Sequence, residues 1–317
     1  MKHNKYSKRI VTRQFQILLY AITFILALSA CGSDDNGYNG GNGGSGGSNA
    51  NVNRNIATNN SNVTRMEFPH LRGGNSIIIT HSTNDTYGIN YSLEWDCEKM
   101  SQRWSCYQMY KGYTGNAGRY DPHSNPGSHY GDLQYPYDPN LPSEYYLDDD
   151  YFYGSGFDHG HICPSADRQY SKEANYQTFF LTNMQPQYNR FNAYLWADME
   201  GKVRTWTLQM KNSDTIYACK GGTIDNEANI IKRIKDKLIV PKYFYMAVLL
   251  KNSLGYRAIA LWAENENRDR SGDNIGNYAI TIDELEKRTG IDFFCNLPDN
   301  IENTVESSIA LNAWGLK

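Results

Sequence analysis

Two histidines flank one glycine in the segment Asp158-His159-Gly160-His161, where the chain leaves a predicted strand. Histidine titrates near neutrality and is the most frequent general base in proteins. His161 follows the glycine directly, so its imidazole could face a cleft and accept a proton. A lone loop histidine is more often structural or solvated. His159 and His161 could also bind zinc, but no third nitrogen or sulfur ligand stands at a recognisable spacing.

A second group of polar residues recurs at helical spacing. Asn192, Trp196, Glu200 and Arg204 are each four residues apart, so on an α-helix they form one slowly drifting stripe. An amide, a carboxylate and a guanidinium are costly to bury without partners. The simplest interpretation is a solvated face on which Glu200 and Arg204 form an i,i+4 ion pair. That interpretation leaves unexplained why Asn192 follows so closely on the irregular link of residues 185–191.

Apolar and alternating runs predict the strands that would position these residues. The predicted strands are residues 76–81, 87–95, 104–110, 178–184, 214–220, 243–250 and 256–261. Residues 111–155 are rich in Gly, Pro, Asp, Asn and Tyr, which predicts a long loop. A loop of that length is usually functional or disordered.

Three segments have helical patterns and settle the expected fold class. They are residues 171–180, 192–208 and 280–294. In the last, Thr281 is a candidate N-cap, Glu284 follows three residues later, and Gly290 would end the helix. Strands mixed with segregated helices, without a regular βαβ alternation, predict an α+β fold, a mixed sheet and helix sandwich.

The N-terminus has the composition of an export signal. Basic side chains are concentrated in residues 1–15, and an apolar run follows over residues 16–30. A transmembrane anchor is the alternative, but this run is short for a membrane span. We therefore expect residues 1–30 to be a lipoprotein signal peptide, with Cys31 as the lipidated first residue of the mature protein.

The segment after the signal differs sharply from the rest of the chain. Residues 31–62 are dominated by Gly, Ser and Asn and have few apolar side chains, which predicts a flexible linker. Residues 63–317 would form one folded domain. Such a protein would be exported and tethered through its lipid to the outer membrane, at the cell surface or facing the periplasm.

Cysteine content and charge limit the interpretation further. An exported domain can keep disulfides, so the five cysteines beyond the lipidation site predict one or two bridges with one thiol left over. These cysteines are Cys97, Cys106, Cys163, Cys219 and Cys295.

The formal net charge of −3 argues mildly against nucleic acid as a partner, because proteins that bind phosphate groups usually carry an excess of basic residues. A local basic cleft remains compatible with that charge.

Three motifs together resemble the DNA/RNA non-specific endonucleases of the ββα-metal, or His-Me finger, superfamily. They are Asp158-His159-Gly160-His161, then Asn183-Met184-x-Pro186-Gln187, and then the stripe of Asn192, Trp196, Glu200 and Arg204. Weaker similarity at residues 240–250 and 280–294 extends the resemblance over roughly residues 76–294. One position departs from the family pattern, because His159 stands where an arginine is usual. The resemblance implies a ββα-metal catalytic core inside the predicted sandwich.

The resemblance also implies a role for each matching residue. Asn192 would be the protein ligand of a hydrated Mg²⁺, for which Mn²⁺ could substitute. His161 would be the general base that takes a proton from the attacking water. Glu200 would hold metal-bound water from outside the first coordination sphere.

The remaining implied roles concern orientation and phosphate binding. Arg204 would bind phosphate in a bidentate manner. Asp158 would orient neighbouring side chains of the site. The family also has an arginine upstream of the catalytic histidine, on the side where the phosphate binds, and Arg119 is the candidate for it in this chain. Three further cations near the motifs could complete a basic patch: Arg168, Arg190 and Lys202.

The sequence thus predicts an exported, membrane-anchored, Mg²⁺-dependent endonuclease that hydrolyses the phosphodiester bonds of DNA and RNA with little sequence specificity. The alternative is a surface lipoprotein of the same fold with a weak or inactive site, which binds a polymer or glycan through its tyrosine-rich loop. Many of the 25 tyrosines lie in residues 107–153, where they could stack on bases. No protein partner can be inferred.

Overall fold

The computed structural model describes residues 50–84, 88–113, 115–124, 133–146 and 151–317. The chain divides into two units, Met1–Gly46 and Gly47–Lys317, and the description concerns the second. The predicted signal peptide, Cys31 and the linker up to residue 49 lie outside the described residues. Within the described ranges, no helix combines the length and the apolar character needed to span a membrane.

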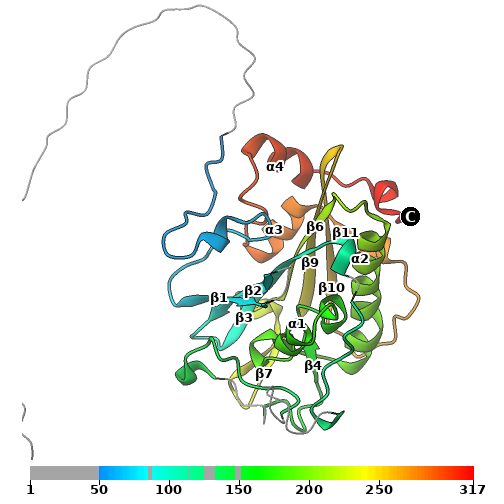
Figure 1. Cartoon of the computed structure of the whole chain (residues 1–317). Coiled ribbons are helices and arrows are strands. Elements are labelled where there is room, and N and C mark those ends of the chain that lie inside the picture. Colours follow the sequence, from blue (N-terminus) through cyan, green and yellow to red (C-terminus); the bar gives the residue numbers. More distant parts are fainter. Residues whose placement is uncertain (1–49, 85–87, 114, 125–132, 147–150) are drawn as a thin grey trace, which may run out of the picture. The chain divides into compact units, whose positions relative to one another are not determined.

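In the described part of the chain, seven strands form one antiparallel sheet in the order β1-β2-β3-β6-β9-β10-β11 (Figure 1). They are β1 (Ser76–Ser82), β2 (Ile89–Asp96), β3 (Ser101–Met109), β6 (Thr215–Gly222), β9 (Tyr243–Asn252), β10 (Gly255–Glu264) and β11 (Ala279–Ile280). Two further hairpins lie apart from this sheet. They are β4 (Asp158–His161) with β5 (Met184–Gln187), and β7 (Ile230–Ile234) with β8 (Leu238–Pro241).

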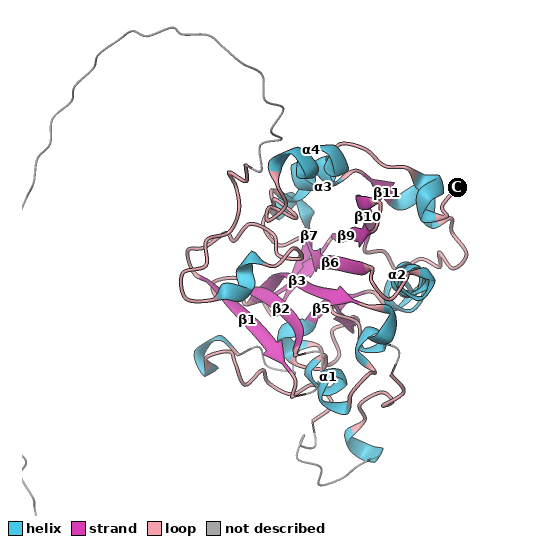
Figure 2. Ribbon diagram, turned by 45° about the horizontal axis from the view of Figure 1, so that its top comes forward, coloured by secondary structure: helices cyan, strands magenta, loops and turns pink. Residues whose placement is uncertain are grey.

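Helices cover the two faces of the sheet (Figure 2). They are α1 (Lys172–Gln177), α2 (Ala197–Gln209), α3 (Ile282–Thr289) and α4 (Asp299–Glu306). Met246 and Val248 of β9 share a core with Val203 of α2. Ala247, between them, lies in a second core with Leu285 of α3. Because successive side chains of a strand point to opposite faces, the sheet is buried on both sides. This arrangement confirms the predicted α+β sandwich.

The hairpin β4–β5 and the helix that follows it form a ββα unit. The helix begins as a π-helical turn at Phe191–Trp196 and continues as α2. A π-turn has one more residue per hydrogen-bonded loop than an α-helix and is frequent at functional sites. The helix predicted at residues 192–208 is thus confirmed, but its first turn is wider than the assumed spacing.

Most of the predicted elements are present, and helix α3 shows why. The Thr281 side chain accepts a hydrogen bond from the backbone N–H of Glu284 at 3.1 Å. Gly290 ends the helix with φ of +69°, a left-handed conformation that glycine adopts without strain. Both ends of α3 were predicted from local signals alone. Residues 111–155 contain only short 3₁₀ turns where the structure describes them, which agrees with the predicted loop.

The strand predicted at residues 178–184 is wrong. Leu181–Asn183 form a 3₁₀ turn, and β5 begins only at Met184. Residues 179–184 are all buried, so the apolar run reflects burial rather than strand geometry. The sequence patterns also did not predict the short hairpin β7–β8 or helix α4.

The folded domain begins before the predicted boundary at residue 63. Asn51 donates a side-chain hydrogen bond to the carbonyl of Leu297 at 2.6 Å. Asn55 is only 5% exposed and donates to the carbonyls of Val63 and Pro69. The boundary was predicted from a lack of apolar side chains, whereas asparagine amides hold this segment in place through hydrogen bonds.

The predicted disulfides are absent among the described cysteines. All five are free thiols, and four of them are buried. Cys106 and Cys219 face each other across β3 and β6, and burial raises the pKa of both thiols well above the usual value. Buried cysteines of this kind act as small apolar side chains of the core.

Replacing Gly160 should test the packing of the β4–β5 hairpin. A Cβ at this position would lie 2.3 Å from Cδ of Gln187, so Gly160→Ala should destabilise the protein by about 1–3 kcal/mol through overpacking. At Gly201 in α2, the nearest atom to an added Cβ is 3.7 Å away. Gly201→Ala is the matched control and should stabilise by about 0.5–1 kcal/mol. Urea unfolding measures both variants, and equal stability of the two would contradict this packing.

Candidate active site

His161, the last residue of β4, has the environment of a neutral base. Its Nε2 is buried and has no hydrogen-bond partner among the described residues. A hydrogen bond with the backbone of His159 raises the pKa of the His161 ring, but burial has the larger effect. Burial, followed by the charge of Arg119, lowers the pKa of His161 to about 3. The free protein therefore holds His161 neutral, with Nε2 available to accept a proton.

Arg119 reaches the same place from the loop before β4. Its guanidinium lies 4.7 Å above the ring of Phe179, and Nη1 donates to Oγ of Ser165 at 2.6 Å. The His161 ring packs edge-on against the same Phe179, with centroids 4.8 Å apart. The structure thus brings the predicted arginine and the predicted base to one aromatic side chain, although 42 positions separate them in the sequence.

Two hydrogen bonds fasten the π-turn to β4. Trp196 Nε1 donates to the carbonyl of His161 at 3.3 Å, and Asn192 Nδ2 donates to Oδ2 of Asp158 at 3.0 Å. Asn189 donates to the same Asp158 oxygen at 3.0 Å. No described residue donates to Oδ1 of Asn192. Asp158 therefore orients the Asn192 amide through its NH₂ group and leaves the oxygen available as a ligand.

Glu200 lies on α2, about one helical turn after Trp196. It belongs to a cluster of four charged side chains that we call the α2 ion cluster: Asp167, Glu200, Arg204 and Lys220. Arg204 Nη1 lies 2.9 Å from Oδ1 of Asp167 and 4.0 Å from Oε2 of Glu200. Lys220 Nζ lies 3.9 Å from Oε1 of Glu200 and 4.0 Å from Oδ2 of Asp167. The structure therefore places Glu200 and Arg204 in a partly buried network rather than on a solvated face.

The α2 ion cluster is short of hydrogen-bond partners. Oε1 of Glu200 and Nζ of Lys220 are both buried and lack a partner among the described residues. Burial raises the pKa of Glu200 to about 7, although the nearby Lys220 opposes the shift. Burial lowers the pKa of Lys220. Buried polar atoms without partners are rare in folded proteins, so this cluster is suited to an additional ligand.

The sequence profile of the DNA/RNA non-specific endonuclease family matches residues 75–300 of the chain. The chain belongs to this family. A nuclease from Nostoc sp. is 30% identical over 253 residues, covering 76% of this chain and 85% of the relative. The mitochondrial nuclease EXOG of Xenopus laevis is 26% identical over 220 residues, covering 66% of this chain and 58% of the relative.

A solved structure agrees with the family assignment at the level of the fold. The crystal structure of an EndoG/EndoGI complex matches with a TM-score of 0.56 at 18% identity, covering 69% of this chain and 86% of that chain. The predicted ββα-metal fold is confirmed. The family and the similar proteins make this chain a metal-dependent, non-specific endonuclease.

The motif around Asn183 has a structural explanation in the endonuclease. Its Oδ1 accepts from the backbone N–H of Cys163, and its Nδ2 donates to the carbonyls of Cys163 and Thr178. This side chain therefore joins the segment after β4 to the segment before β5. Asn183 is fully buried. We interpret it as a positioning residue for the hairpin that carries His161.

His159, which departs from the family pattern, packs between two aromatic rings. Its ring stacks on Tyr135 at 3.7 Å and on Phe152 at 4.1 Å, with interplanar angles of 7° and 20°. It thus holds the tyrosine-rich loop against β4. Among the described residues, no third His, Cys, Asp or Glu joins His159 and His161 in a group able to hold zinc. The zinc interpretation therefore has no structural support.

Arg168 is not part of a basic patch. Its side chain is fully buried, both terminal nitrogens donate to the carbonyl of Gln108, and the guanidinium lies 4.3 Å above the ring of Tyr107. Arg204 is also less available than predicted, because Asp167 binds it, although 31% of its side chain is exposed. Both arginines lie near the motifs in the sequence, but this nearness alone could not tell a structural arginine from one that is available at the site.

The motifs did not predict Asp167, Lys220 or Tyr107, whose hydroxyl donates to Oδ2 of Asp167 at 2.9 Å. One signal was present at Lys220. It stands within a strand whose other residues are apolar or small, and a lysine in a buried strand needs a partner. The position of that partner depends on how α2 and the segment after β4 pack on the sheet.

The titration of His161 tests this electrostatic environment. The ring should stay neutral from pH 8 to pH 5, with a midpoint near 3. A positive charge disfavours protonation, so Arg119→Gln should raise the pKa of His161. Imidazole nitrogen NMR shifts measure both effects. Arg233→Gln, which removes an exposed guanidinium on β7, should leave the midpoint unchanged. A wild-type midpoint near 6.5 would refute the buried environment.

Proposed function

We propose that the protein is a Mg²⁺-dependent endonuclease that cleaves both DNA and RNA with little sequence preference and uses His161 as its general base. The observation that carries the proposal is a set of polar atoms without partners on two connected elements. His161 Nε2 on β4 and Glu200 Oε1 on α2 are buried without a partner among the described residues. Asn192 lies on the same helix as Glu200, and Asp158 holds its amide through the NH₂ group. Mn²⁺ would be an alternative ion.

The residues fit a hydrated magnesium ion. Mg²⁺ prefers oxygen ligands, retains several waters and is usually held by few protein groups. Asn192 Oδ1 would bind the ion directly, and Glu200 would accept hydrogen bonds from its waters. Asp158 keeps the amide in the required orientation. When bound, the ion would polarise the phosphoryl oxygen and stabilise the leaving 3′-oxygen.

Arg119 links substrate binding to the strength of the base. In the free protein, its charge contributes to the low pKa of His161. A phosphodiester beside Arg119 would neutralise that charge, and its own negative charge would favour protonation of the ring. His161 would therefore become a stronger base when substrate is present, which moves its pKa toward the range where general bases work best.

The charge distribution supports backbone binding without base recognition. Arg119 and Arg204 place positive charge at the site, although the whole chain has a formal net charge of −3. Contacts to phosphate position a nucleic acid but carry no sequence information. Beside Arg204 and Asp167 lies a cavity of about 190 Å³ whose lining includes Tyr110 and Leu208, with room for part of a neighbouring nucleotide.

Cleavage assays test the proposed mechanism. The purified protein should cut plasmid DNA and RNA only with Mg²⁺ or Mn²⁺. His161→Ala should lower kcat about 10²- to 10⁴-fold, because a general base contributes that much. Asn192→Ala should raise the Mg²⁺ concentration needed for half-maximal activity.

His70→Ala is the control and should retain activity, because His70 is exposed and its backbone N–H bonds the carbonyl of Asp292, in the segment that follows α3. Full activity of His161→Ala would exclude it as the base. A wild-type protein that binds polymer but does not cut would favour the alternative, a binding protein with an inactive site.

We further propose that residues 1–30 direct export and that Cys31 carries the lipid that anchors the enzyme to the outer membrane, at the cell surface or facing the periplasm. The support is the short apolar run that ends in Ser29-Ala30-Cys31. Cys31→Ser should move the protein from the membrane fraction to the soluble fraction and abolish labelling by a fatty-acid analogue. Wild-type protein without label would refute lipidation.

A further inference from the structure

An acidic cavity of about 360 Å³ lies where α3, α4 and the N-terminal segment of residues 50–55 meet. We call it the acidic cavity. Six carboxylates contribute to its lining: Asp283, Glu286, Asp292, Asp299, Glu302 and Glu306. Leu285 of α3 and Val305 of α4 pack in the second core, whereas α2 packs in the first. Helices α3 and α4 therefore lie on the face of the sheet opposite α2 (Figure 2), and the acidic cavity that they line lies away from the α2 ion cluster.

Three of these carboxylates converge closely. The ligand oxygens of Asp283, Glu286 and Glu306 all lie within 4.8 Å of one another. No Lys or Arg among the described residues forms an ion pair with any of the three. The three carboxyl groups thus face one another across a cavity whose described lining contains no Lys, Arg or His side chain.

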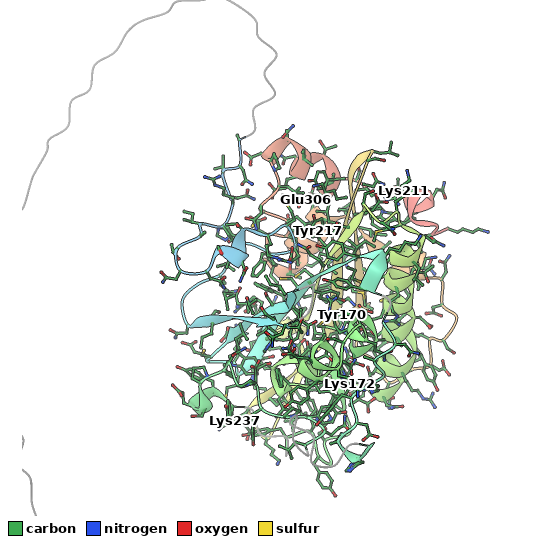
Figure 3. All side chains as sticks on the ribbon, viewed as in Figure 1. Tyr170, Lys172, Lys211, Tyr217, Lys237 and Glu306 are labelled. Carbon is green, nitrogen blue, oxygen red and sulfur yellow. The ribbon has the colours of Figure 1, made fainter. Side chains whose placement is uncertain are left out.

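Glu306 gives an observation that points directly to a ligand. This residue, labelled in Figure 3, ends α4 where that helix packs on α3. It is only 5% exposed, and its Oε1 has no hydrogen-bond partner within the described ranges. A buried carboxylate in this position is stable only with a proton or with a cation.

Besides Oε1 of Glu306, the side chain of Asn53 supplies a neutral amide oxygen without a partner, from a different part of the chain. Its Nδ2 donates to Oδ2 of Asp292 at 3.0 Å and to Oε1 of Glu302 at 2.8 Å, so the amide is held in one orientation. Its Oδ1 is buried and lacks a partner among the described residues, like Oε1 of Glu306. Asn53 lines the acidic cavity, so the N-terminal segment brings an amide oxygen without a partner to a lining made mainly of carboxylates.

We propose that the acidic cavity is a Ca²⁺ site in which Asp283, Glu286 and Glu306 provide carboxylate ligands and Asn53 ties the N-terminal segment to the bound ion. Calcium takes six to eight oxygen ligands in flexible geometry, including carboxylates, amide oxygens and water. The cavity has room for several waters and contributes neither nitrogen nor sulfur ligands from histidine or cysteine. Magnesium requires a smaller octahedral cage and suits this wide cavity less well.

Calorimetric titration of the metal-free protein with Ca²⁺ tests the site. Glu306→Gln should abolish binding or weaken it at least 10-fold. Glu284→Gln is the matched control, because Glu284 lies on α3 beside Asp283 but outside the lining of the cavity, and pairs with Arg288 at 2.8 Å. This control should bind Ca²⁺ like the wild type. Asn192→Ala should also retain the site, which separates it from the proposed catalytic metal.

Stability and exchange measurements give independent readouts. At a Ca²⁺ concentration 100 times Kd, the Tm of the wild type should rise by roughly 5 °C or more, and that of Glu306→Gln should not. Ca²⁺ should slow amide exchange in residues 50–55. Glu306→Gln should keep its Mg²⁺-dependent nuclease activity, so failure of the calcium site and failure of the proposed catalysis would be distinguishable.

Three outcomes would overturn the proposal: no Ca²⁺ binding by the wild type, binding that disappears in Asn192→Ala but persists in Glu306→Gln, or binding without any effect on residues 50–55. Should Glu306→Gln fail to fold, Asp283→Asn replaces it. Asp283 is an exposed member of the cluster, so its substitution leaves the core intact. Unchanged Ca²⁺ affinity in that variant would likewise contradict the site.

Discussion

The candidate active site depends on the connection between strand β4 and the π-turn that leads into α2. His161 is on the strand, whereas Asn192 and Glu200 are on the helix, and neither element alone contains a base and a metal ligand. The Trp196 indole holds the carbonyl of His161, and the Asp158 carboxylate holds the NH₂ group of Asn192. At His161 the bond uses the backbone carbonyl as acceptor, and at Asn192 it uses the amide NH₂ group as donor. The imidazole nitrogen and the amide oxygen therefore stay available for chemistry.

Burial gives these groups their chemical character. The protein places an imidazole, a carboxylate and an ammonium where they have few hydrogen-bond partners, and a surrounding core must keep them there. The central sheet provides that core because it is covered on both faces. In such surroundings the interactions among Arg119, His161, Glu200 and Lys220 are stronger than in water. A negatively charged, metal-bound substrate would complement this arrangement.

Local signals in the sequence predicted the central strands, the long loop and helix α3 with both of its caps. The family resemblance, carried by three short motifs, predicted the ββα fold, which the family match and the solved relative confirm. Features set by tertiary packing were not predictable in this way. Within the apolar run of residues 178–184, the Asn183 side chain forms hydrogen bonds with three backbone groups, and these bonds stabilise a turn instead of the predicted strand. Lys220 and Asp167 join the site only through packing, and asparagines order residues 50–55 without an apolar pattern.

The most direct test of the central claim is anomalous scattering from a crystal grown with Mn²⁺. Our account predicts a peak within coordination distance of Oδ1 of Asn192, and no peak at that place in Asn192→Ala. A well-ordered crystal without a peak at Asn192, or with the His161 ring turned away from the ion, would contradict the account.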